Sequence, residues 1–199
     1  MKTLNSLSNG VRSEADVSFR SARLGDIDDI MMIEEESFLP GVMESREVFM
    51  ERIRIFPAGF LIMNIKEYVG AIGYISSELW RIDGVPGKEL FILGHSIQKA
   101  HSANGNMLYI SSMGILKQYR KNGLGRELFS ALIRNICSCH TEINRLILIV
   151  GEPWHAARRI YESEGFQKLF TLENFFTPLG ADTFDSIVMV KGVSNNGYK

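Results

Sequence analysis

The chain has 199 residues, 45% of them hydrophobic and 23% charged, with a net charge of -1. This is enough for one α/β domain with a full core. The near-neutral charge, without a basic stripe, excludes an electrostatic footprint for nucleic acid. No apolar run approaches the roughly 20 residues that cross a bilayer, and the polar N-terminus lacks the apolar core of a secretory signal. We therefore expect a cytoplasmic protein with no membrane partner.

Strand-like and helix-like runs alternate along the chain, which indicates one mixed α/β (α+β) domain over residues 17–191. The remaining residues, 1–16 and 192–199, read as flexible ends. Capping residues and one-sided apolar spacing mark the helix starts. Predicted helices begin near Asp26, Ser45, Gly123 and Pro153, and predicted strands cover residues 17–22, 60–65, 68–76, 107–115, 145–150, 166–171 and 187–191.

One connection, residues 81–106, is unusually long for a compact domain. Connections of this length commonly cover a functional site or are mobile. We therefore expect it to lie over an acceptor pocket or to move.

The segment 118–126 reads Gln-Tyr-Arg-Lys-Asn-Gly-Leu-Gly-Arg and joins a strand-like run to a helix-like run. Glycines let the backbone approach an anion closely, and the first N–H groups of a helix point outward with the positive end of the macrodipole behind them. Arg120, Lys121 and Arg126 add positive charge. The segment predicts a pyrophosphate site, the alternative being a glycine turn that only enters a helix.

The glycine spacing differs from the dinucleotide-binding and nucleoside-triphosphate motifs. Residues Arg120–Gly125 instead resemble the Arg/Gln-x-x-Gly-x-Gly/Ala signature of the GNAT superfamily of N-acetyltransferases. Residues Ala157–Phe166 resemble the Ala-x-x-x-Tyr-Glu-x-x-Gly-Phe segment of the same family, at the expected distance downstream. The resemblance implies a single GNAT domain, with a mixed and mostly antiparallel sheet of about seven strands flanked by about four helices.

Within the superfamily, the chain resembles the serotonin (arylalkylamine) N-acetyltransferase branch in residues 33–38 and 77–80. That branch has a His-x-His pair in the strand before the glycine turn, where this chain has Tyr109 and Ser111. A histidine route for removing the amine proton is therefore absent or comes from elsewhere.

The resemblance implies acetyl-coenzyme A as co-substrate. The strand 107–115 would splay from its neighbour and offer backbone groups to the pantetheine arm and to the reacting carbonyl. The turn that follows would hold the pyrophosphate. The cofactor-binding residues implied are Met113, Gly114, Ile115, Arg120, Lys121, Asn122, Gly123, Leu124, Gly125 and Arg126.

Two side chains are candidates for proton transfer. Tyr161 matches the family tyrosine that protonates the departing thiolate, the alternative being a tyrosine that only packs. Glu36 stands where the related branch has a glutamate and is the candidate base, the alternative being a solvated residue in an acidic run. His95, His101 and His155 are weaker candidates, because a lone histidine in a loop is more often an ordinary surface residue.

The leading interpretation is an N-acetyltransferase acting on a small, aromatic or hydrophobic primary amine by direct transfer in a ternary complex. Two alternatives stay open: a peptide or protein acceptor, and a catalytically silent acyl-coenzyme-A-binding module. The acceptor pocket is expected between the first two helices, the 81–106 connection and the segment 174–185. The candidate pocket residues are Phe38, Phe56, Phe91, Phe175, Phe176, Glu36, Glu89 and Asp83.

The two cysteines, Cys137 and Cys139, lie beside His140. A structural metal site would need further ligands at suitable spacing, so we expect no metal. Members of the resembled family often pair through their later strands, which leaves a homodimer open.

Overall fold

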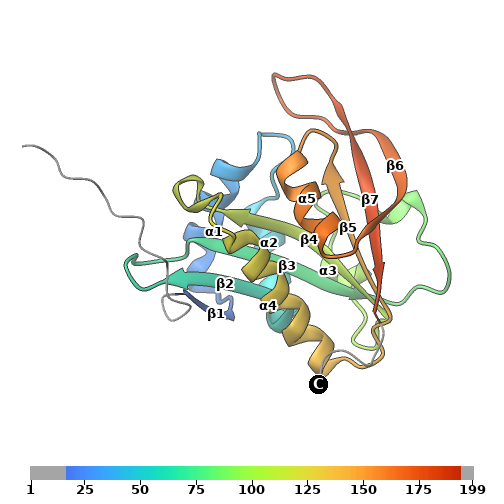
Figure 1. The fold of residues 1–199 in the computed structure, drawn as a ribbon, viewed down its shortest axis with the longest axis horizontal. Coiled ribbons are helices and arrows are strands. Elements are labelled where there is room, and N and C mark those ends of the chain that lie inside the picture. Colours follow the sequence, from blue (N-terminus) through green and yellow to red (C-terminus); the bar gives the residue numbers. More distant parts are fainter. Residues whose placement is uncertain (1–16, 194–199) are drawn as a thin grey trace, which may run out of the picture.

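The computed structural model describes residues 17–193. Seven strands form one sheet in the order β1-β2-β3-β4-β5-β7-β6 (Figure 1). Only β4 and β5 pair in parallel, and the other neighbours are antiparallel. The predicted mixed, mostly antiparallel sheet is therefore confirmed. The strands are β1 Val17–Ser21, β2 Phe60–Ile65, β3 Gly73–Trp80, β4 Met107–Ile115, β5 Arg145–Gly151, β6 Gln167–Phe176 and β7 Phe184–Gly192.

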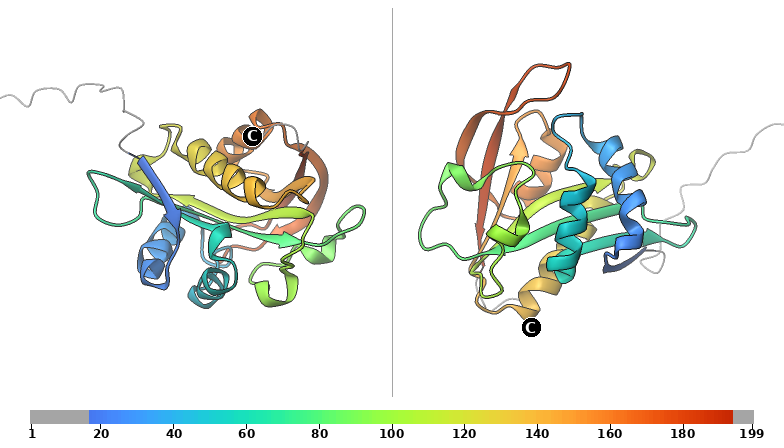
Figure 2. Two further views of the ribbon diagram at one scale, coloured as in Figure 1. Left: turned by 90° about the horizontal axis from the view of Figure 1, so that it is seen from below. Right: turned by 180° about the vertical axis from the view of Figure 1, so that it is seen from behind.

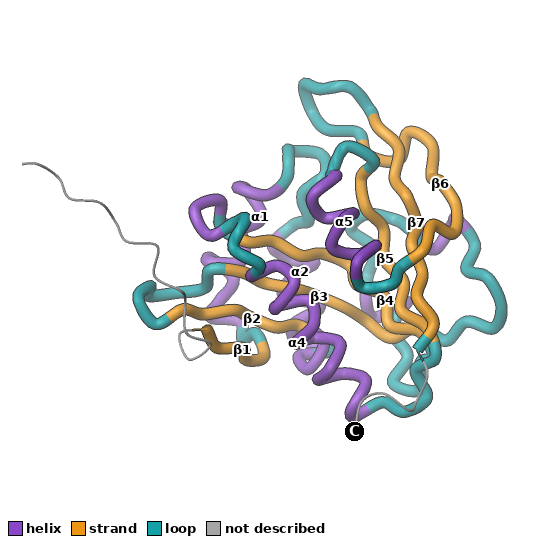
Figure 3. Tube along the Cα trace, in the orientation of Figure 1, coloured by secondary structure: helices purple, strands orange, loops and turns teal. Residues whose placement is uncertain are grey.

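Helices cover both faces of the sheet (Figure 2). Helices α1 (Ile27–Ser37) and α2 (Arg46–Ile55) lie on one face, and α4 (Leu124–Cys139) and α5 (His155–Ser163) on the other. These are the four predicted helices. A 3-10 turn, Lys88–Leu90, and a short helix, α3 (Ile97–Ala100), lie within the 81–106 connection, which is otherwise mostly loop (Figure 3).

The two residues predicted to cap α1 and α2, Asp26 and Ser45, make different hydrogen bonds. The Ser45 hydroxyl accepts a hydrogen bond from the Val48 amide and caps α2 as expected. Asp26 directly precedes α1, but its carboxylate binds the Arg20 guanidinium at 2.7 Å and the Arg23 amide at 2.8 Å. The acidic side chain therefore joins the helix entry to β1.

The predicted chain ends can be compared with the structure only in part. β7 continues to Gly192, which pairs with Arg145 of β5, so the last strand runs one residue beyond the predicted boundary. Residues 1–16 and 194–199 lie outside the described residues. Between residues 17 and 193, no helix is long and apolar enough to cross a bilayer.

An aromatic cluster fixes α4 and α5 to each other. Phe129 of α4 is fully buried, with its ring centroid 5.3 Å from that of Tyr161 and 5.7 Å from that of Phe166. The cluster links the helix that follows the glycine turn to the helix that carries the candidate acid.

We expect Phe129→Ala to lower the free energy of unfolding by about 3–5 kcal/mol, because it removes a buried ring and leaves a cavity between the two helices. Urea denaturation followed by circular dichroism measures this loss. Phe129→Leu, which keeps most of the apolar volume, should lose less. A loss below about 1 kcal/mol for the alanine variant would show that the cluster contributes little to holding the helices together.

Candidate active site

The candidate site lies where the pairing between β4 and β5 ends. The two strands pair only from Met107 to Ile110, opposite residues Arg145 to Leu148. At the same point the pairing with β3 shifts, because Ser76 faces Ser112 while Ser77 faces Ile110. Ser111 is the extra residue between these two pairs and forms a β-bulge, which bends β4 and increases its twist. The second half of β4 therefore splays from β5, as predicted.

A cavity of about 750 Å³ fills the opening. It extends from the glycine turn at the start of α4, along β4, to the end of α1. Lining residues come from both separated strands, from α1 and the segment that follows it, and from α5. Those used below are Glu34, Phe38, Val42, Glu44, Leu93, Ser111, Ser112, Met113, Gly114, Ile115, Arg120, Lys121, Gly123, Gly125, Arg126, Trp154, His155, Tyr161 and Phe176.

The glycine turn lies at one end of this cavity. Gly123 directly precedes α4 and has a φ of 79°, in the left-handed region that favours glycine. Its carbonyl accepts from the Arg126 and Glu127 amides, which starts the helix. Gly125 lines the cavity, so the amino end of the α4 macrodipole faces the cavity. This is the geometry expected of an anion site.

The positive side chains of the turn have different surroundings. The Arg120 guanidinium donates to the Ile115 carbonyl at 2.7 Å and to the Glu36 carbonyl at 2.9 Å, so it ties the turn to β4 and α1. Arg126 pairs with Glu164 at 2.6 Å, and Lys121 is exposed. All three line the cavity.

Two predicted cofactor residues do not line the cavity. Leu124 is 2% exposed, and its side chain belongs to the core. Asn122 is exposed, and its side-chain amide donates to the Tyr119 carbonyl at 3.4 Å. Any contact from Leu124 to a bound anion would come from its backbone amide at the helix start.

The middle of the cavity is bounded by Met113, Gly114 and Ile115 of β4. A Cβ on Gly114 would lie 2.8 Å from the Ile33 side chain and 2.9 Å from the Tyr74 ring. Glycine at this position therefore allows α1 to pack directly on the strand.

Tyr161 reaches the same cavity from α5. It is 7% exposed, and burial raises the pKa of its phenol above the usual value. The side chain therefore remains protonated at neutral pH and is available as a proton donor.

The acidic residues of α1 are distributed differently from the prediction. Glu36 is exposed and does not line the cavity, and its carboxylate accepts from the Lys117 amide at 2.8 Å. Glu34 lines the cavity and is 1% exposed. Residues two apart on a helix point about 200° apart, so only one of the two can face the sheet. Glu34 follows the buried Ile27 and Ile30 by seven and four residues, a spacing that could have identified it.

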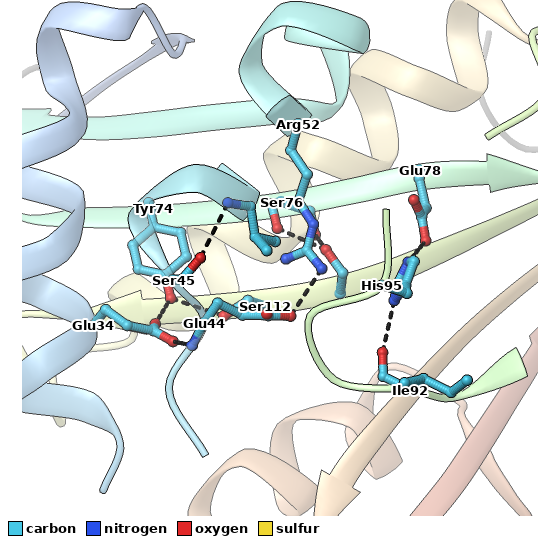
Figure 4. Close-up of polar contacts among 12 residues, drawn as sticks. Glu34, Glu44, Ser45, Arg52, Tyr74, Ser76, Glu78, Ile92, His95 and Ser112 are labelled. Carbon is cyan, nitrogen blue, oxygen red and sulfur yellow. Dashed lines mark hydrogen bonds and ion pairs between the residues drawn. The ribbon is translucent and has the colours of Figure 1, made fainter. Parts of the chain in front are cut away.

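Glu34 is held in a polar cluster inside the fold (Figure 4). Its Oε1 accepts from the Glu44 amide at 2.8 Å, and its Oε2 accepts a short hydrogen bond from the Tyr74 hydroxyl. The Tyr74 hydroxyl also lies 2.8 Å from Ser112 Oγ. Burial raises the pKa of Glu34 to about 7, although the hydrogen bonds from Tyr74 and Glu44 lower it in part. A carboxyl with this pKa can take up or release a proton near neutral pH.

Beside this cluster, Arg52 and Glu44 form an ion pair at 2.8 Å, with side chains 2% and 7% exposed. The Arg52 charge lowers the pKa of Glu34, and the Glu44 charge raises it. The pair therefore belongs to the electrostatic environment of the candidate base.

Two of the candidate histidines lie outside the cavity. His95 pairs with the buried Glu78, and the His101 ring accepts from the Leu79 amide at 3.1 Å. Both contacts fasten the 81–106 connection to β3, and Leu93 is its one residue among those that line the cavity. The third candidate, His155, does line the cavity.

Only two of the eight predicted acceptor-pocket residues line the cavity. Phe38 and Phe176 line the cavity, and the Trp154 ring lies between them at centroid distances of 5.3 and 4.8 Å. The remaining candidates are not among the lining residues: Phe56, Phe91, Phe175, Glu36, Glu89 and Asp83. Phe56 and Phe91 are buried in the two core clusters instead.

Residues 27–166 match the acetyltransferase (GNAT) family over most of the chain. The chain belongs to this family. Membership supports the predicted enzyme class, an N-acetyltransferase dependent on acetyl-coenzyme A. It also confirms the predicted GNAT fold.

The relatives of this GNAT protein refine the prediction. N-alpha-acetyltransferase 50 of Danio rerio is 30% identical over 76 residues, which cover 38% of this chain and 45% of that protein. The match thus spans less than half of the relative. Because this relative is an N-alpha-acetyltransferase, the comparisons support the superfamily and not the predicted serotonin branch.

Solved structures share the fold. The loading GNATL domain of CurA from Lyngbya majuscula has a TM-score of 0.72 and 13% identity, with 88% of this chain and 97% of that chain covered. Arabidopsis thaliana Naa50 in complex with the bisubstrate analogue CoA-Ac-MVNAL has a TM-score of 0.65 and 17% identity, with 89% and 99% covered. At these identities the likeness concerns the fold alone.

The raised pKa of Glu34 predicts a pH dependence of stability. Its value of about 7 lies above the ordinary 4.5, so protonated Glu34 stabilises the fold, and this contribution is lost as pH rises through 7. We expect the advantage of the wild type over Glu34→Gln to fall by on the order of 3 kcal/mol between about pH 4 and pH 8.

Urea denaturation of both proteins across this range measures the difference, and circular dichroism confirms that each is folded before denaturant is added. Parallel stability profiles would show that Glu34 titrates as an ordinary carboxyl.

Proposed function

We propose that this GNAT protein transfers an acetyl group from acetyl-coenzyme A to the α-amino group of a peptide or protein N-terminus. The observation that carries the proposal is a single cavity that joins the glycine turn, the splayed β4 and two buried proton-transfer groups, Glu34 and Tyr161. The similarity to N-alpha-acetyltransferase 50 favours a peptide acceptor over a small amine.

Acetyl-coenzyme A binds with its pyrophosphate on the turn, where the α4 amino end and the positive side chains meet. Its pantetheine arm follows the free edge of β4 at Met113 to Ile115. Backbone amides there stabilise the oxyanion that forms on the acetyl carbonyl. Most of the binding energy comes from the non-reacting end of the cofactor.

Glu34 and Tyr161 divide the proton transfers. The amine nitrogen attacks the acetyl carbon, the C–S bond breaks, the amine proton passes to Glu34, and the Tyr161 phenol protonates the departing thiolate. Exchange with solvent then resets both groups. We assign the base to Glu34 in place of Glu36, because of the two only Glu34 lines the cavity.

The acceptor end of the cavity suits the N-terminus of a peptide. The Leu179 amide donates to the Pro40 carbonyl at 2.7 Å, which joins the segment after α1 to the loop between β6 and β7. Phe38, Val42 and Phe176 line the cavity on either side of this junction. An acceptor therefore enters end-on between joined loops, and the exposed Leu179 offers an apolar surface for its following residues.

A small hydrophobic amine is the second candidate acceptor. The aromatic side chains of Phe38, Trp154 and Phe176 support it, because they would contact an aryl group. A silent acyl-coenzyme-A-binding module is less well supported, since such a module has no need of a buried carboxyl with a pKa near neutrality.

Thiol release from acetyl-coenzyme A distinguishes these acceptors. We expect turnover with the peptide Met-Val-Asn-Ala-Leu and no turnover with the same peptide blocked at its α-amine. Phenethylamine is the matched small amine, and an α-blocked lysine peptide tests side-chain acetylation. Turnover with phenethylamine alone would favour the second candidate. Cofactor binding without turnover of any amine would favour a silent module.

Two substitutions should separate cofactor binding from chemistry. Gly123→Glu places a carboxylate in the turn and should weaken acetyl-coenzyme A binding at least tenfold by calorimetry, because it repels the pyrophosphate. Tyr161→Phe should lower kcat by about 10²-fold with little change in affinity, since it removes a proton donor and keeps the ring.

Gly84→Glu is the control for the first substitution, because Gly84 also has a positive φ and open space around it. Equal affinities for Gly123→Glu and Gly84→Glu would exclude the turn as the pyrophosphate site. An unchanged kcat for Tyr161→Phe would show that Tyr161 packs in the site and is not the proton donor.

A further inference from the structure

We propose that Ser112 and Tyr74 form a hydroxyl relay that carries the proton from the acceptor amine to Glu34. The inference rests on the proposed acetyl transfer and deepens it. It starts from the position of Glu34, which is 1% exposed and has both carboxylate oxygens occupied by the Glu44 amide and the Tyr74 hydroxyl. An incoming amine therefore meets a base that already has hydrogen-bond partners.

The surroundings of Tyr74 suit a hydroxyl that accepts one proton and donates another. It is fully buried on β3, and its ring is fixed against Phe49 and Phe60 at centroid distances of 5.3 and 5.9 Å. Burial and the neighbouring Glu34 charge hold the pKa of its phenol well above the usual value. The hydroxyl therefore stays protonated and passes protons on without becoming a phenolate.

Ser112 is the end of the chain that meets the cavity. It lies directly after the bulge on β4, lines the cavity and is partly exposed, whereas Tyr74 and Glu34 are almost completely buried. When Glu34 is ionised, the single Tyr74 hydroxyl proton is donated to Glu34, so the Ser112 hydroxyl donates to Tyr74 across their 2.8 Å contact. The Ser112 oxygen, which lines the cavity, then has a lone pair free to accept a proton.

One coordinated shift moves the proton. A proton of the acceptor's ammonium group is transferred to Ser112 Oγ, the original Ser112 proton to the Tyr74 oxygen, and the original Tyr74 proton to Glu34 Oε2. The amine becomes neutral, Glu34 becomes a carboxylic acid, and both hydroxyls end with one proton each. Rotation of the hydroxyls and loss of the Glu34 proton to solvent restore the starting arrangement.

The test compares Ser112→Ala with wild type in acetylation of the Met-Val-Asn-Ala-Leu peptide across pH. A peptide α-amine has a pKa near 8, so the relay is needed most below that pH. We expect kcat/KM of Ser112→Ala to fall by about 10²-fold near pH 7, with the deficit shrinking as pH rises and the amine enters already neutral. Ser112→Thr keeps a hydroxyl and should recover most of the rate.

Matched variants separate the relay from a general loss of packing. Ser77→Ala removes a buried β3 hydroxyl that bonds the Gly59 carbonyl, away from the cavity, and should retain the wild-type profile. Tyr74→Phe should show the same pH-dependent deficit as Ser112→Ala. Tyr109→Phe, at another buried tyrosine, is its control.

The outcomes distinguish the two proposals. Activity of Ser112→Ala within twofold of wild type, with Glu34→Gln inactive, would overturn the relay and leave the acetyl transfer intact. A deficit constant across pH would also overturn the relay, because it would indicate a structural role. Absence of turnover by the wild-type protein with every amine would overturn the proposed function and the relay together.

Discussion

The divergence of β4 from β5 is the constraint on which the site depends. Parallel strands normally satisfy each other's backbone groups along their length, and here the pairing stops at Ile110 and Leu148. The bulge at Ser111 makes this possible, because β4 keeps its pairing with β3 while changing direction. After Ile110, β4 thus pairs with β3 along one edge and has unpaired backbone groups along the other edge. The cavity follows directly from this division.

The parts of the site that follow from local sequence were predictable. The conformation of a glycine turn before a helix depends mainly on its own residues, so residues 120–126 could suggest an anion site from their sequence. The strand 107–115 was predicted with the bounds that the structure has. Tyr161 could be placed because its segment resembles a family pattern and its helix begins near Pro153.

The base could not be selected in the same way. Glu34, Glu35 and Glu36 form one acidic run, and a run by itself predicts a solvated face. What distinguishes Glu34 is its contact with Tyr74, 40 residues away, and with the Glu44 amide. Tertiary contacts of this kind have no local signal. The contacts of the 81–106 connection have no local signal either, since the polar contacts of His95 and Arg145 that hold it join distant segments.

The buried cluster also resolves a conflict in the chemistry. A site for a protonated amine benefits from negative charge, yet the amine must lose its proton before it reacts. Glu34 and Glu44 carry two carboxylates against the one charge of Arg52, which favours an incoming cation. Burial then raises the pKa of Glu34 to about 7, close to the value near 8 of a peptide amine. Proton transfer between groups with similar pKa values costs little, so in the proposed mechanism the cluster that attracts the ammonium also converts it to the neutral nucleophile.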